Sequence, residues 1–469
     1  MKEFDLVVIG SGPAGEKAAV KAAYFGHKVA LVEAEKNFGG AGVNTGTLPS
    51  KTLKETSLYY SGKYLKGLYG DAFNINLDNS IQKFLYREKL VCDVSAREVK
   101  ENILRHKVTI FNGYGRFEDD HHIRVLGSKE ELIRGEKIII ATGSYPYHPP
   151  KIPFDCMRVH DSDSILTMNR FPKSICIIGA GVIGCEYATI FASLDIPVYL
   201  VNKQSDILGF LDKEISGELV EQMTKSGVDI IFNSELKDIK IPEDQDSPID
   251  VHLSTEETLH VDMFLYAAGR CGNSKNLGCE NAGIEIASRE AIKVNENYQT
   301  SKPHIYAVGD VIGFPALAST SMDQGRVAVA HMYDTNDLDS LSKIIPFGIY
   351  TIPEVSMVGI SEEQAQKEGI PYCVGRAHHK KMARGRIMGA EDGLLKIIFH
   401  RESLKVLGVH IIGSLASESI HYGLSTVETE TTVLEIVSTV FNYPTLHDLY
   451  KYACYDGLGN LNGYKIKED

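Results

Sequence analysis

The sequence predicts an α/β protein with two parallel sheets and a smaller α+β unit at the C-terminal end. Residues 4–33 and 174–202 each contain an apolar run, a GxGxxG turn, a helical stretch and a second apolar run. Beyond residue 390, the alternating segments GLLKIIFH and VLGVHIIG predict a hairpin, and helical stretches follow from residue 415. The chain has 469 residues and 43% apolar composition, enough for about three domains of ordinary size.

The repeated unit has the pattern of a Rossmann-like, dinucleotide-binding fold. Its first glycine permits a sharp turn out of the strand, the second lets the backbone approach a pyrophosphate, and the third lets the helix pack on the strand. The helix N-terminus then holds the phosphates. The glycines are Gly10, Gly12 and Gly15 in the first copy and Gly179, Gly181 and Gly184 in the second. Because strand, helix and strand flank both turns in one register, two dinucleotide sites are predicted.

The residue that ends the second strand differs between the two copies. Glu33 and Asn202 both stand 21 positions after the middle glycine of their unit. A carboxylate at this position accepts hydrogen bonds from a ribose diol, whereas an amide does not repel a 2′-phosphate. The next residue, Lys203, either offers a positive charge to such a phosphate or points into solvent. The two sites are therefore expected to hold different dinucleotides.

Three further apolar segments predict buried strands. KIIIATG at residues 137–143 and FLYAAG at residues 264–269 each resemble the strand that closes one of the two units. IYAVGD at residues 305–310 ends another apolar run in Asp310. An aspartate at a strand end either caps the following segment or contacts a ligand, and the pattern alone leaves both open.

Charge and composition argue against several kinds of partner. The formal charge of −13 opposes binding to nucleic acid or to anionic membranes. No apolar run approaches the 18 or so residues of a membrane span, and the first strand begins too early for a signal peptide, so the cytoplasm is expected. The cysteines show no CxxC or metal-ligand spacing and are expected to be small buried side chains, with no metal site. They are Cys92, Cys156, Cys176, Cys185, Cys271, Cys279, Cys373 and Cys454.

Taken together, these motifs resemble the flavoprotein disulfide reductases, the family of dihydrolipoamide dehydrogenase and glutathione reductase. The resemblance implies that Gly10, Gly12, Gly15 and Glu33 bind the ADP half of FAD, with Gly115 near the adenine. It places Asp310 on the ribityl chain of the flavin and Ala318 nearby. The remaining cofactor-binding candidates are Gly40, Thr142 and Gly143 for FAD and Gly269 and Arg270 for the nicotinamide nucleotide.

The resemblance also implies a domain order in which the second nucleotide domain is inserted into the first. Residues 1–150 and 273–343 are expected to form the FAD domain, and residues 151–272 the NAD(P) domain between them. Residues 344–469 are expected to form a dimerisation domain, which makes the protein a homodimer or a higher homo-oligomer. This insertion explains why an FAD residue at position 310 follows the second glycine turn.

The sulfur chemistry of the family is missing from two separate segments. The reductases carry GGxCxxxxCxPxK beneath the flavin, but residues 39–51 read GGAGVNTGTLPSK, with Gly42 and Thr47 at the cysteine positions. Neither residue forms a disulfide. Near the C-terminus, FNYPTLHD has Tyr443 at the position of the catalytic histidine and Asp448 at that of its glutamate. A tyrosine is a poor base at neutral pH.

One branch of the family combines these features, the soluble transhydrogenases that move hydride between NAD(H) and NADP(H) through FAD. GTLPSK, FNYPT, GAGVIGCEYA and AVGDVIG resemble the landmarks of that branch, although its members usually keep a cysteine at the position of Gly42. The resemblance implies that Lys51 and Glu186 form an ion pair beside the flavin, as the matching residues do in the family, and a buried lysine and a buried glutamate each need such a partner. The alternative is that Glu186 lies on a helix surface. Tyr443 is expected to reach the flavin of the partner subunit, or else only to pack the dimer interface.

Two other functions remain open on the sequence. One is an NAD(P)H-dependent reductase of another acceptor, such as a quinone or oxygen. The other is a catalytically silent flavoprotein subunit, which the intact Glu186 and Arg270 argue against. The single basic cluster, residues 376–386, is expected to be a solvated strand edge in preference to a site that steers nucleotides.

Overall fold

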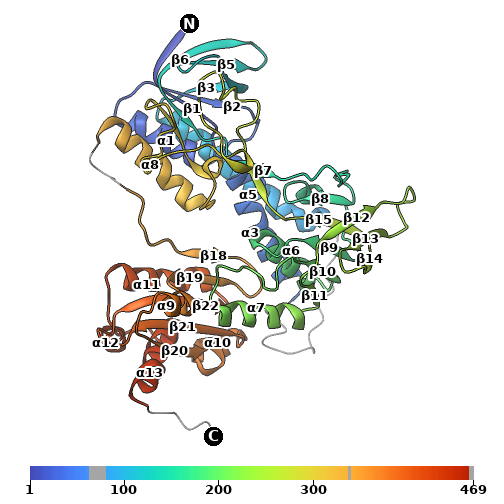
Figure 1. Cartoon of the computed structure of the whole chain (residues 1–469), viewed down its shortest axis with the longest axis vertical. Coiled ribbons are helices and arrows are strands. Elements are labelled where there is room, and N and C mark those ends of the chain that lie inside the picture. Colours follow the sequence, from blue (N-terminus) through green and yellow to red (C-terminus); the bar gives the residue numbers. More distant parts are fainter. Residues whose placement is uncertain (63–80, 336–339, 464–469) are drawn as a thin grey trace.

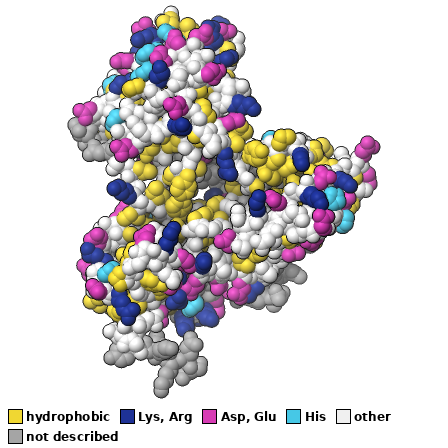
Figure 2. Space-filling view, in the orientation of Figure 1, with side chains coloured by type: hydrophobic (Ala, Val, Ile, Leu, Met, Phe, Trp, Pro, Cys, Tyr) yellow, Lys and Arg dark blue, Asp and Glu magenta, His cyan; other side chains and the backbone are white. Residues whose placement is uncertain are grey.

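The computed structural model describes residues 1–62, 81–335 and 340–463. The described chain forms three units, each built on its own main sheet (Figure 1). The first unit lies at the top of the view, the second at the right and the third, in red, at the bottom. Where the three units meet the surface is hollowed, and apolar side chains gather around the hollow (Figure 2). No helix in the described ranges is long and apolar enough to cross a membrane.

The first unit has a seven-stranded sheet in the order β3-β2-β1-β6-β5-β4, with β17 also paired to β6. The parallel strands are β1 (Lys2–Ile9), β2 (Val29–Glu33), β3 (Thr109–Asn112), β6 (Glu131–Ile140) and β17 (Ile305–Ala307), and β4 (Tyr114–Phe117) and β5 (His122–Leu126) run antiparallel. Its helices are α1 (Pro13–Tyr24), α2 (Gly40–Asn44), α3 (Thr47–Tyr60), α5 (Ile81–Arg105) and α8 (Ala318–Tyr333).

Both faces of this sheet are buried, as the continuous apolar strands predict. Leu6 and Val8 of β1 pack with residues of α1 and α8 in one core. Val7 and Ile9, which point to the opposite face, pack in a second core with the β4–β5 hairpin. The alternation follows from the two-residue period of a strand.

The second unit has a five-stranded parallel sheet in the order β11-β10-β9-β15-β8. Its strands are β8 (Val159–Asp161), β9 (Ile175–Ile178), β10 (Val198–Val201), β11 (Val228–Ile231) and β15 (Met263–Tyr266), with helices α6 (Val182–Ser193) and α7 (Lys213–Lys225). A three-stranded antiparallel sheet of β12 (Leu236–Lys240), β13 (Ile249–Leu253) and β14 (Thr258–Val261) lies beside it.

The second unit lies within the sequence of the first. The chain leaves the first sheet after β6, builds the second unit, and returns to pair β17 with β6. A two-stranded antiparallel pair, β7 (Ser144–Pro146) with β16 (Arg270–Gly272), brings the outgoing and returning chains together. The predicted insertion is therefore present, and the boundaries at residues 150, 272 and 343 stay predictions.

The third unit is the predicted α+β unit. Its antiparallel sheet has the order β18-β19-β22-β21-β20, from β18 (Phe347–Ile349), β19 (Val355–Gly359), β20 (Tyr372–His378), β21 (Gly393–His400) and β22 (Val406–Gly413). The hairpin predicted from GLLKIIFH and VLGVHIIG is β21–β22. The helices are α9 (Glu362–Lys367), α10 (Ala383–Met388), α11 (Ala416–Glu428), α12 (Val433–Ser438) and α13 (Asp448–Asn462). One short 3-10 turn, at His379–Lys381, also belongs to this unit; those at Ser164–Thr167, Ser288–Glu290 and Gly309–Ile312 lie in the other two units.

Two expectations from the sequence are wrong in part. The basic cluster of residues 376–386 begins on an edge strand, as predicted. However, Arg376 is ion-paired with Glu214 of the second unit and His379 is fully buried. Only the other charged side chains of the cluster resemble a solvated edge. Six cysteines are buried as predicted, whereas Cys156 is exposed and Cys373 is half-buried. Cys156 lies in the turn before β8, where its φ is +57°, and apolar patterning does not register such a turn.

Candidate functional site

A cavity of about 1260 Å³ opens where β1, β2 and β6 end and α1 begins. It is larger than most small-molecule pockets, which span roughly 300–1,000 Å³. Residues of all three units line it, and many of the predicted site residues, all from the first two units, are among them. They are Gly10, Gly12, Glu33, Gly40, Lys51, Gly115, Thr142, Gly143, Glu186, Arg270, Asp310 and Ala318. Gly15, Gly179, Gly181, Gly184, Asn202, Lys203, Gly269 and Tyr443 do not line it.

The first and third glycines of both turns are required by the fold itself. Gly10 and Gly179 both have a φ of +103°, a conformation that favours glycine. A Cβ added to Gly15 would lie 2.0 Å from the carbonyl oxygen of Gly10, and one added to Gly184 would lie 1.8 Å from that of Gly179. The two turns therefore have the same geometry, with the helix packed directly on the turn.

The middle glycines have no such internal reason. A Cβ added to Gly181 would meet nothing within 4 Å, and one added to Gly12 would meet only the Cα of Gly40, at 3.8 Å. Gly12 is the N-cap of α1, and no side chain caps that helix end. The bare backbone leaves room for a group that approaches the N-terminus closely, and a pyrophosphate is such a group. The donor chemistry at both turns fits a dinucleotide.

Glu33 and Asn202 accept equivalent backbone hydrogen bonds in the two units. The Ser11 amide donates to Oε2 of Glu33 at 2.8 Å, and the Ala180 amide donates to Oδ1 of Asn202 at 3.4 Å. Asn202 also donates from Nδ2 to the carbonyl oxygen of Asp206 at 2.6 Å and so closes the turn that follows β10. The sequence gives no sign of this second role.

Lys203, the other residue proposed to recognise the second nucleotide, is already paired. Its Nζ lies 3.1 Å from Oε2 of Glu235, and both side chains are exposed. An exposed pair of this kind contributes little and is screened by salt. Lys203 can therefore exchange Glu235 for a phosphate at small cost.

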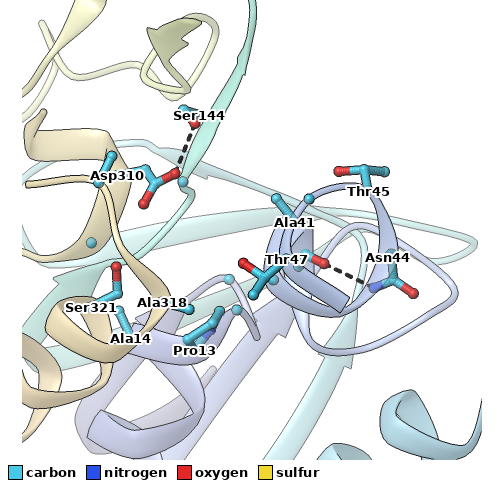
Figure 3. A pocket seen from close by; sticks show the side chains of 18 of the residues that line it. Pro13, Ala14, Ala41, Asn44, Thr45, Thr47, Ser144, Asp310, Ala318 and Ser321 are labelled. Atoms are coloured by element: carbon cyan, nitrogen blue, oxygen red, sulfur yellow. Dashed lines mark hydrogen bonds between the residues drawn. The ribbon is translucent and has the colours of Figure 1, made fainter. Parts of the chain in front are cut away.

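Thr142, Gly143 and Asp310 all line the cavity. Figure 3 shows Ser144, which follows Gly143 in the sequence, beside Asp310. Ser144 donates a hydrogen bond to the Asp310 carboxylate at 3.0 Å, and Thr142 donates to the carbonyl oxygen of Asn273 at 2.7 Å. The strand end therefore presents a carboxylate to the cavity, not a cap for the next segment. Ser144 was not predicted, because its sequence neighbours give no hint of Asp310.

Gly115 and Ala318 also line the cavity. A Cβ added to Gly115 would lie 3.2 Å from Ile9, so even alanine is tight beside the first strand. Ala318 is the first residue of α8, whose N-terminal turn faces the cavity. Both residues are small and line the cavity.

No cysteine lines the cavity among the described residues. Gly42 lies in α2 and Thr47 begins α3, the two positions where the reductases carry sulfur. A Cβ added to Gly42 would lie 2.8 Å from Cγ of Pro13, the first residue of α1. The space that a cysteine would need at position 42 is thus taken by the helix that begins the dinucleotide turn.

Lys51 and Glu186 form the predicted ion pair on the cavity wall. Lys51 Nζ lies 2.8 Å from Oε2 of Glu186, which is 3% exposed. The Tyr350 amide donates to Oε1 of Glu186 at 3.0 Å, and the Tyr350 ring lies 4.9 Å from the Lys51 ammonium. The pair therefore joins α3, α6 and the third unit at a single point.

Arg270 lies on the cavity wall, but its donors are in use. The guanidinium donates to Ser144 and Ser162, and its Nη1 lies 2.9 Å from Oδ1 of Asp163. These contacts tie β16 to the first and second units. Gly269, with a φ of +130°, accepts a backbone hydrogen bond from Tyr147 and lies outside the cavity.

Tyr443 does not line the cavity, and the residue is 76% exposed. It stands between α12 and α13 of the third unit. His447, the N-cap residue of α13, packs against Phe441 and Tyr450. An exposed aromatic side chain on this unit is available to a second copy of the chain.

Two family models match the chain. The first, described as pyridine nucleotide-disulphide oxidoreductase, covers residues 4–325. The second, described as the dimerisation domain of the same proteins, covers residues 345–454. Together they span all three units.

Curated relatives match over nearly the whole chain. A soluble pyridine nucleotide transhydrogenase from Photorhabdus laumondii is 42% identical over 463 residues, covering 98% of this chain and 99% of the relative. Proteins of the same name are 40% identical in Mycobacterium tuberculosis, over 98% of both chains, and 42% identical in Escherichia coli, over 98% of this chain and 99% of the relative.

Solved structures share the fold. The Cu(II) complex of the HOCl-induced flavoprotein disulfide reductase RclA from Escherichia coli superposes with a TM-score of 0.88 at 26% identity, covering 97% of this chain and 99% of that one. LpdA from Mycobacterium tuberculosis gives the same TM-score at 23% identity, over 97% and 99% of the two chains.

Proposed function

The chain belongs to the pyridine nucleotide-disulphide oxidoreductase family, and we propose that within this family it transfers hydride between NADP(H) and NAD(H) without disulfide chemistry. One observation carries this proposal. The cavity keeps its dinucleotide geometry and its Lys51–Glu186 pair, while Gly42 and Thr47 stand where the family carries sulfur. The names of relatives at 40–42% identity support it.

The first unit supplies the residues that would hold FAD. Gly10, Gly12 and the N-terminus of α1 would hold the pyrophosphate, and Glu33 the adenine ribose. Asp310 would accept hydrogen bonds from the ribityl chain, with Ser144 fixing its carboxylate. When bound, FAD supplies the chemistry of accepting a hydride from one nicotinamide and giving it to another.

The second unit would hold the nicotinamide nucleotides in turn. Gly179, Gly181 and Gly184 repeat the geometry of the first turn. Asn202 carries no charge that would repel a 2′-phosphate, and Lys203 can leave Glu235 to meet one. A site of this kind accepts both NAD(H) and NADP(H), which transhydrogenation requires.

Lys51 and Glu186 would fix the wall where the two rings meet. Each charge is costly to bury alone, and each neutralises the other here. Tyr350 holds Glu186 from the third unit through its backbone amide. The pair would hold α3 and α6 together on the side of the cavity where the nicotinamide meets the flavin.

A homodimer completes the site in this proposal. Residues 345–454 match the dimerisation domain of the family, and Tyr443 stands exposed on that unit. We propose that Tyr443 covers the flavin face of the partner subunit, where the family carries its disulfide. The relatives are named soluble transhydrogenases, which supports a cytoplasmic location.

Steady-state hydride transfer tests the proposal. The purified protein should be yellow with noncovalent FAD, and NADPH should reduce the thionicotinamide analogue of NAD without added thiol. A colourless protein that no flavin reconstitutes would remove the assignment. A yellow protein that oxidises NADPH but passes hydride only to a quinone or to oxygen would instead be a reductase of another acceptor.

A further inference from the structure

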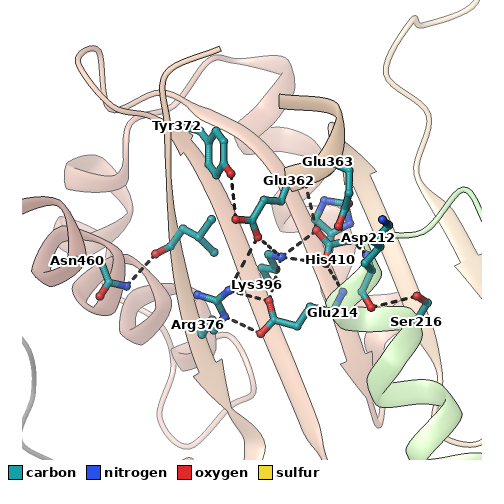
Figure 4. A network of polar contacts seen from close by, with 12 residues as sticks. Asp212, Glu214, Ser216, Glu362, Glu363, Tyr372, Arg376, Lys396, His410 and Asn460 are labelled. Atoms are coloured by element: carbon teal, nitrogen blue, oxygen red, sulfur yellow. Dashed lines mark hydrogen bonds and ion pairs between the residues drawn. The ribbon is translucent and has the colours of Figure 1, made fainter. Parts of the chain in front are cut away.

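Three basic residues lie side by side across the sheet of the third unit. The strand register pairs Arg376 of β20 with Lys396 of β21, and Lys396 with His410 of β22. In Figure 4 these side chains face the N-terminus of α7, which carries Asp212 and Glu214. Because α7 belongs to the second unit, the row joins the nucleotide-binding unit to the dimerisation unit.

Lys396 is the centre of this contact. Its side chain is 1% exposed, and its ammonium lies 3.0 Å from Asp212, 2.9 Å from Glu214 and 2.6 Å from Glu362. A buried ammonium needs partners for all of its donors, and these three carboxylates supply them. Two of the three come from the second unit.

Arg376 holds Glu214 from the neighbouring strand. Its Nε and Nη2 donate to the two carboxylate oxygens of Glu214 at 2.6 and 2.8 Å, a bidentate pair with fixed geometry. Burial alone raises the pKa of Glu214, but hydrogen bonds from Arg376 and Lys396 outweigh it and lower that pKa to about 2. Glu214 therefore stays ionised at any physiological pH.

Asp212 connects two helices of different units. It is fully buried and caps α7 by accepting from the Glu214 amide at 3.1 Å. Its other oxygen accepts from the amide of Glu362, which begins α9, at 3.2 Å. We call Asp212, Glu214, Glu362, Arg376 and Lys396 the α7 clamp.

The α7 clamp lies at the end of the segment that carries the proposed nucleotide-recognition residues. Asn202 and Lys203 begin this segment, and Asp212 ends it nine residues after Lys203. Within it, the Asn202 side chain donates to the carbonyl oxygen of Asp206, and Ile207 and Leu208 are buried. The segment is thus fixed at both ends.

A second contact between the same two units lies on α6. Glu186 accepts from the Tyr350 amide, and Thr189 accepts from the Ile352 amide at 3.1 Å. A body held at one point can pivot about it, whereas contacts on two separate helices fix its orientation. An apolar contact could join the units as tightly, but a shift of α7 would leave the buried Lys396 charge without its carboxylate partners, which is costly.

We propose that the α7 clamp is a positioning device that fixes the nucleotide-binding unit on the dimerisation unit, so that the bound nicotinamide meets the flavin in reacting geometry. This inference rests on the proposed function, because it concerns the same hydride transfer. None of its residues lines the cavity, so they act through the orientation of α6 and α7. A displacement of about 1 Å at a reacting centre can lower a rate by about 10²-fold.

The test uses the FAD-loaded protein and variants of Arg376. Arg376 is chosen because it is less buried than Lys396 and because its substitution leaves the Lys396–Asp212 contact intact. Arg376→Gln removes the bidentate pair, Arg376→Lys restores the charge, and Glu214→Gln removes the charge from the other side. Lys405→Gln is the matched control, because Lys405 pairs with Glu430 on the surface of the third unit alone. FAD content, amide hydrogen exchange of α7, and anaerobic flavin reduction over a range of NADPH concentrations are measured.

Arg376→Gln and Glu214→Gln should keep FAD and exchange the amides of α7 at least tenfold faster. In these two variants the rate of flavin reduction at saturating NADPH should fall about 10- to 100-fold, with little change in the half-saturating NADPH concentration. Arg376→Lys should recover part of the rate. Lys405→Gln should reduce its flavin at the normal rate. Faster exchange with reduction within twofold of the unmutated protein would make the clamp merely structural. Unchanged exchange would also overturn the inference. If only one of the two nucleotides reduces the unmutated protein, the proposed function fails. The flavin reduction rates of the clamp variants are then compared using that nucleotide, so the inference is still tested.

Discussion

Lys51 Nζ on α3 lies 2.8 Å from Glu186 Oε2 on α6, so the first two units meet in an ion pair on the wall of the cavity. Glu186→Gln keeps an acceptor for the Tyr350 amide but removes the charge that holds Lys51. We expect FAD to be retained and flavin reduction by NADPH to slow by about 10²-fold, because the nicotinamide side loses its fixed geometry. Rapid-mixing absorbance measures the rate.

Lys2→Met is the control for this change, because Lys2 and Glu131 form an exposed pair on the outside of the first unit. It should reduce at the normal rate. Equal rates for Glu186→Gln and the unmutated protein would show that the ion pair serves folding alone.

The missing sulfur predicts a spectroscopic result. With Gly42 and Thr47 in place of cysteines, two-electron reduction should yield no thiolate-to-flavin charge-transfer band. Dihydrolipoamide and reduced glutathione should not be turned over, and a thiol reagent should not inactivate the reduced protein. Rapid inactivation after reduction would mean that another cysteine, outside the cavity wall as described, takes part.

Tyr443 predicts protection of the reduced flavin from oxygen. If it covers the flavin face of the partner subunit, Tyr443→Ala should raise NADPH oxidase activity more than it lowers FAD affinity. Tyr86→Ala is a matched control, because Tyr86 is an exposed tyrosine on α5 of the first unit. Oxygen consumption that stays unchanged would leave Tyr443 as a packing residue of the interface.

The turn after β10 predicts the nucleotide preference. Asn202→Glu should retain NADH but lose about 1–3 kcal/mol of NADPH binding, since it places a carboxylate beside the 2′-phosphate. Binding is measured by titration of the oxidised protein with each nucleotide. Weaker binding of both nucleotides by the same factor would mean that the lost hydrogen bond to Asp206 disorders the turn.

Lys203→Ala should weaken NADPH alone, and more at low salt than at high salt, because the charge is exposed. Lys237→Ala controls for net charge, since Lys237 pairs with Glu256 elsewhere on the second unit. A Lys203→Ala protein that binds NADPH normally at low salt would place that side chain in solvent.

His379 predicts a loss of stability in acid. It is fully buried against Gly393 and Gly413, and burial lowers its pKa from 6.5 to about 4. Between these two values the unfolded chain binds a proton that the folded chain does not, so stability falls as pH drops from 6.5 to about 4. The loss is about 3 kcal/mol at the lower end.

His379→Phe should reduce the slope of this part of the pH profile, and the rest of the slope belongs to other histidines whose pKa burial lowers, such as His160 and His410. The substitution breaks no side-chain hydrogen bond, because neither ring nitrogen of His379 has a partner among the described residues. Denaturant unfolding between pH 4 and 7 measures the slope. The same slope in both proteins would assign the acid sensitivity to other groups.

Patterns local in the sequence predicted the fold well. The two glycine turns, their strands and the β21–β22 hairpin each follow from residues within about 30 positions of one another. The resemblance to a known family predicted the Lys51–Glu186 pair across 135 positions. No such signal predicted that Arg376 pairs with Glu214, 162 positions away, or that Lys203 pairs with Glu235. A charged residue in the sequence does not indicate which distant segment will supply its partner. Cys156 and the turn closed by Asn202 were missed because backbone turns of this kind have no apolar period.

Anaerobic stopped-flow with NADH and NADPH in separate experiments tests the central claim most directly. Because Asn202 and Lys203 beside the second glycine turn would accept both NADH and NADPH, either nucleotide should bleach the flavin absorbance. Addition of the other oxidised nucleotide should then restore it, with no thiol present. Reduction by only one of the two nucleotides, or a reduced flavin that neither NAD nor NADP reoxidises, would contradict the account.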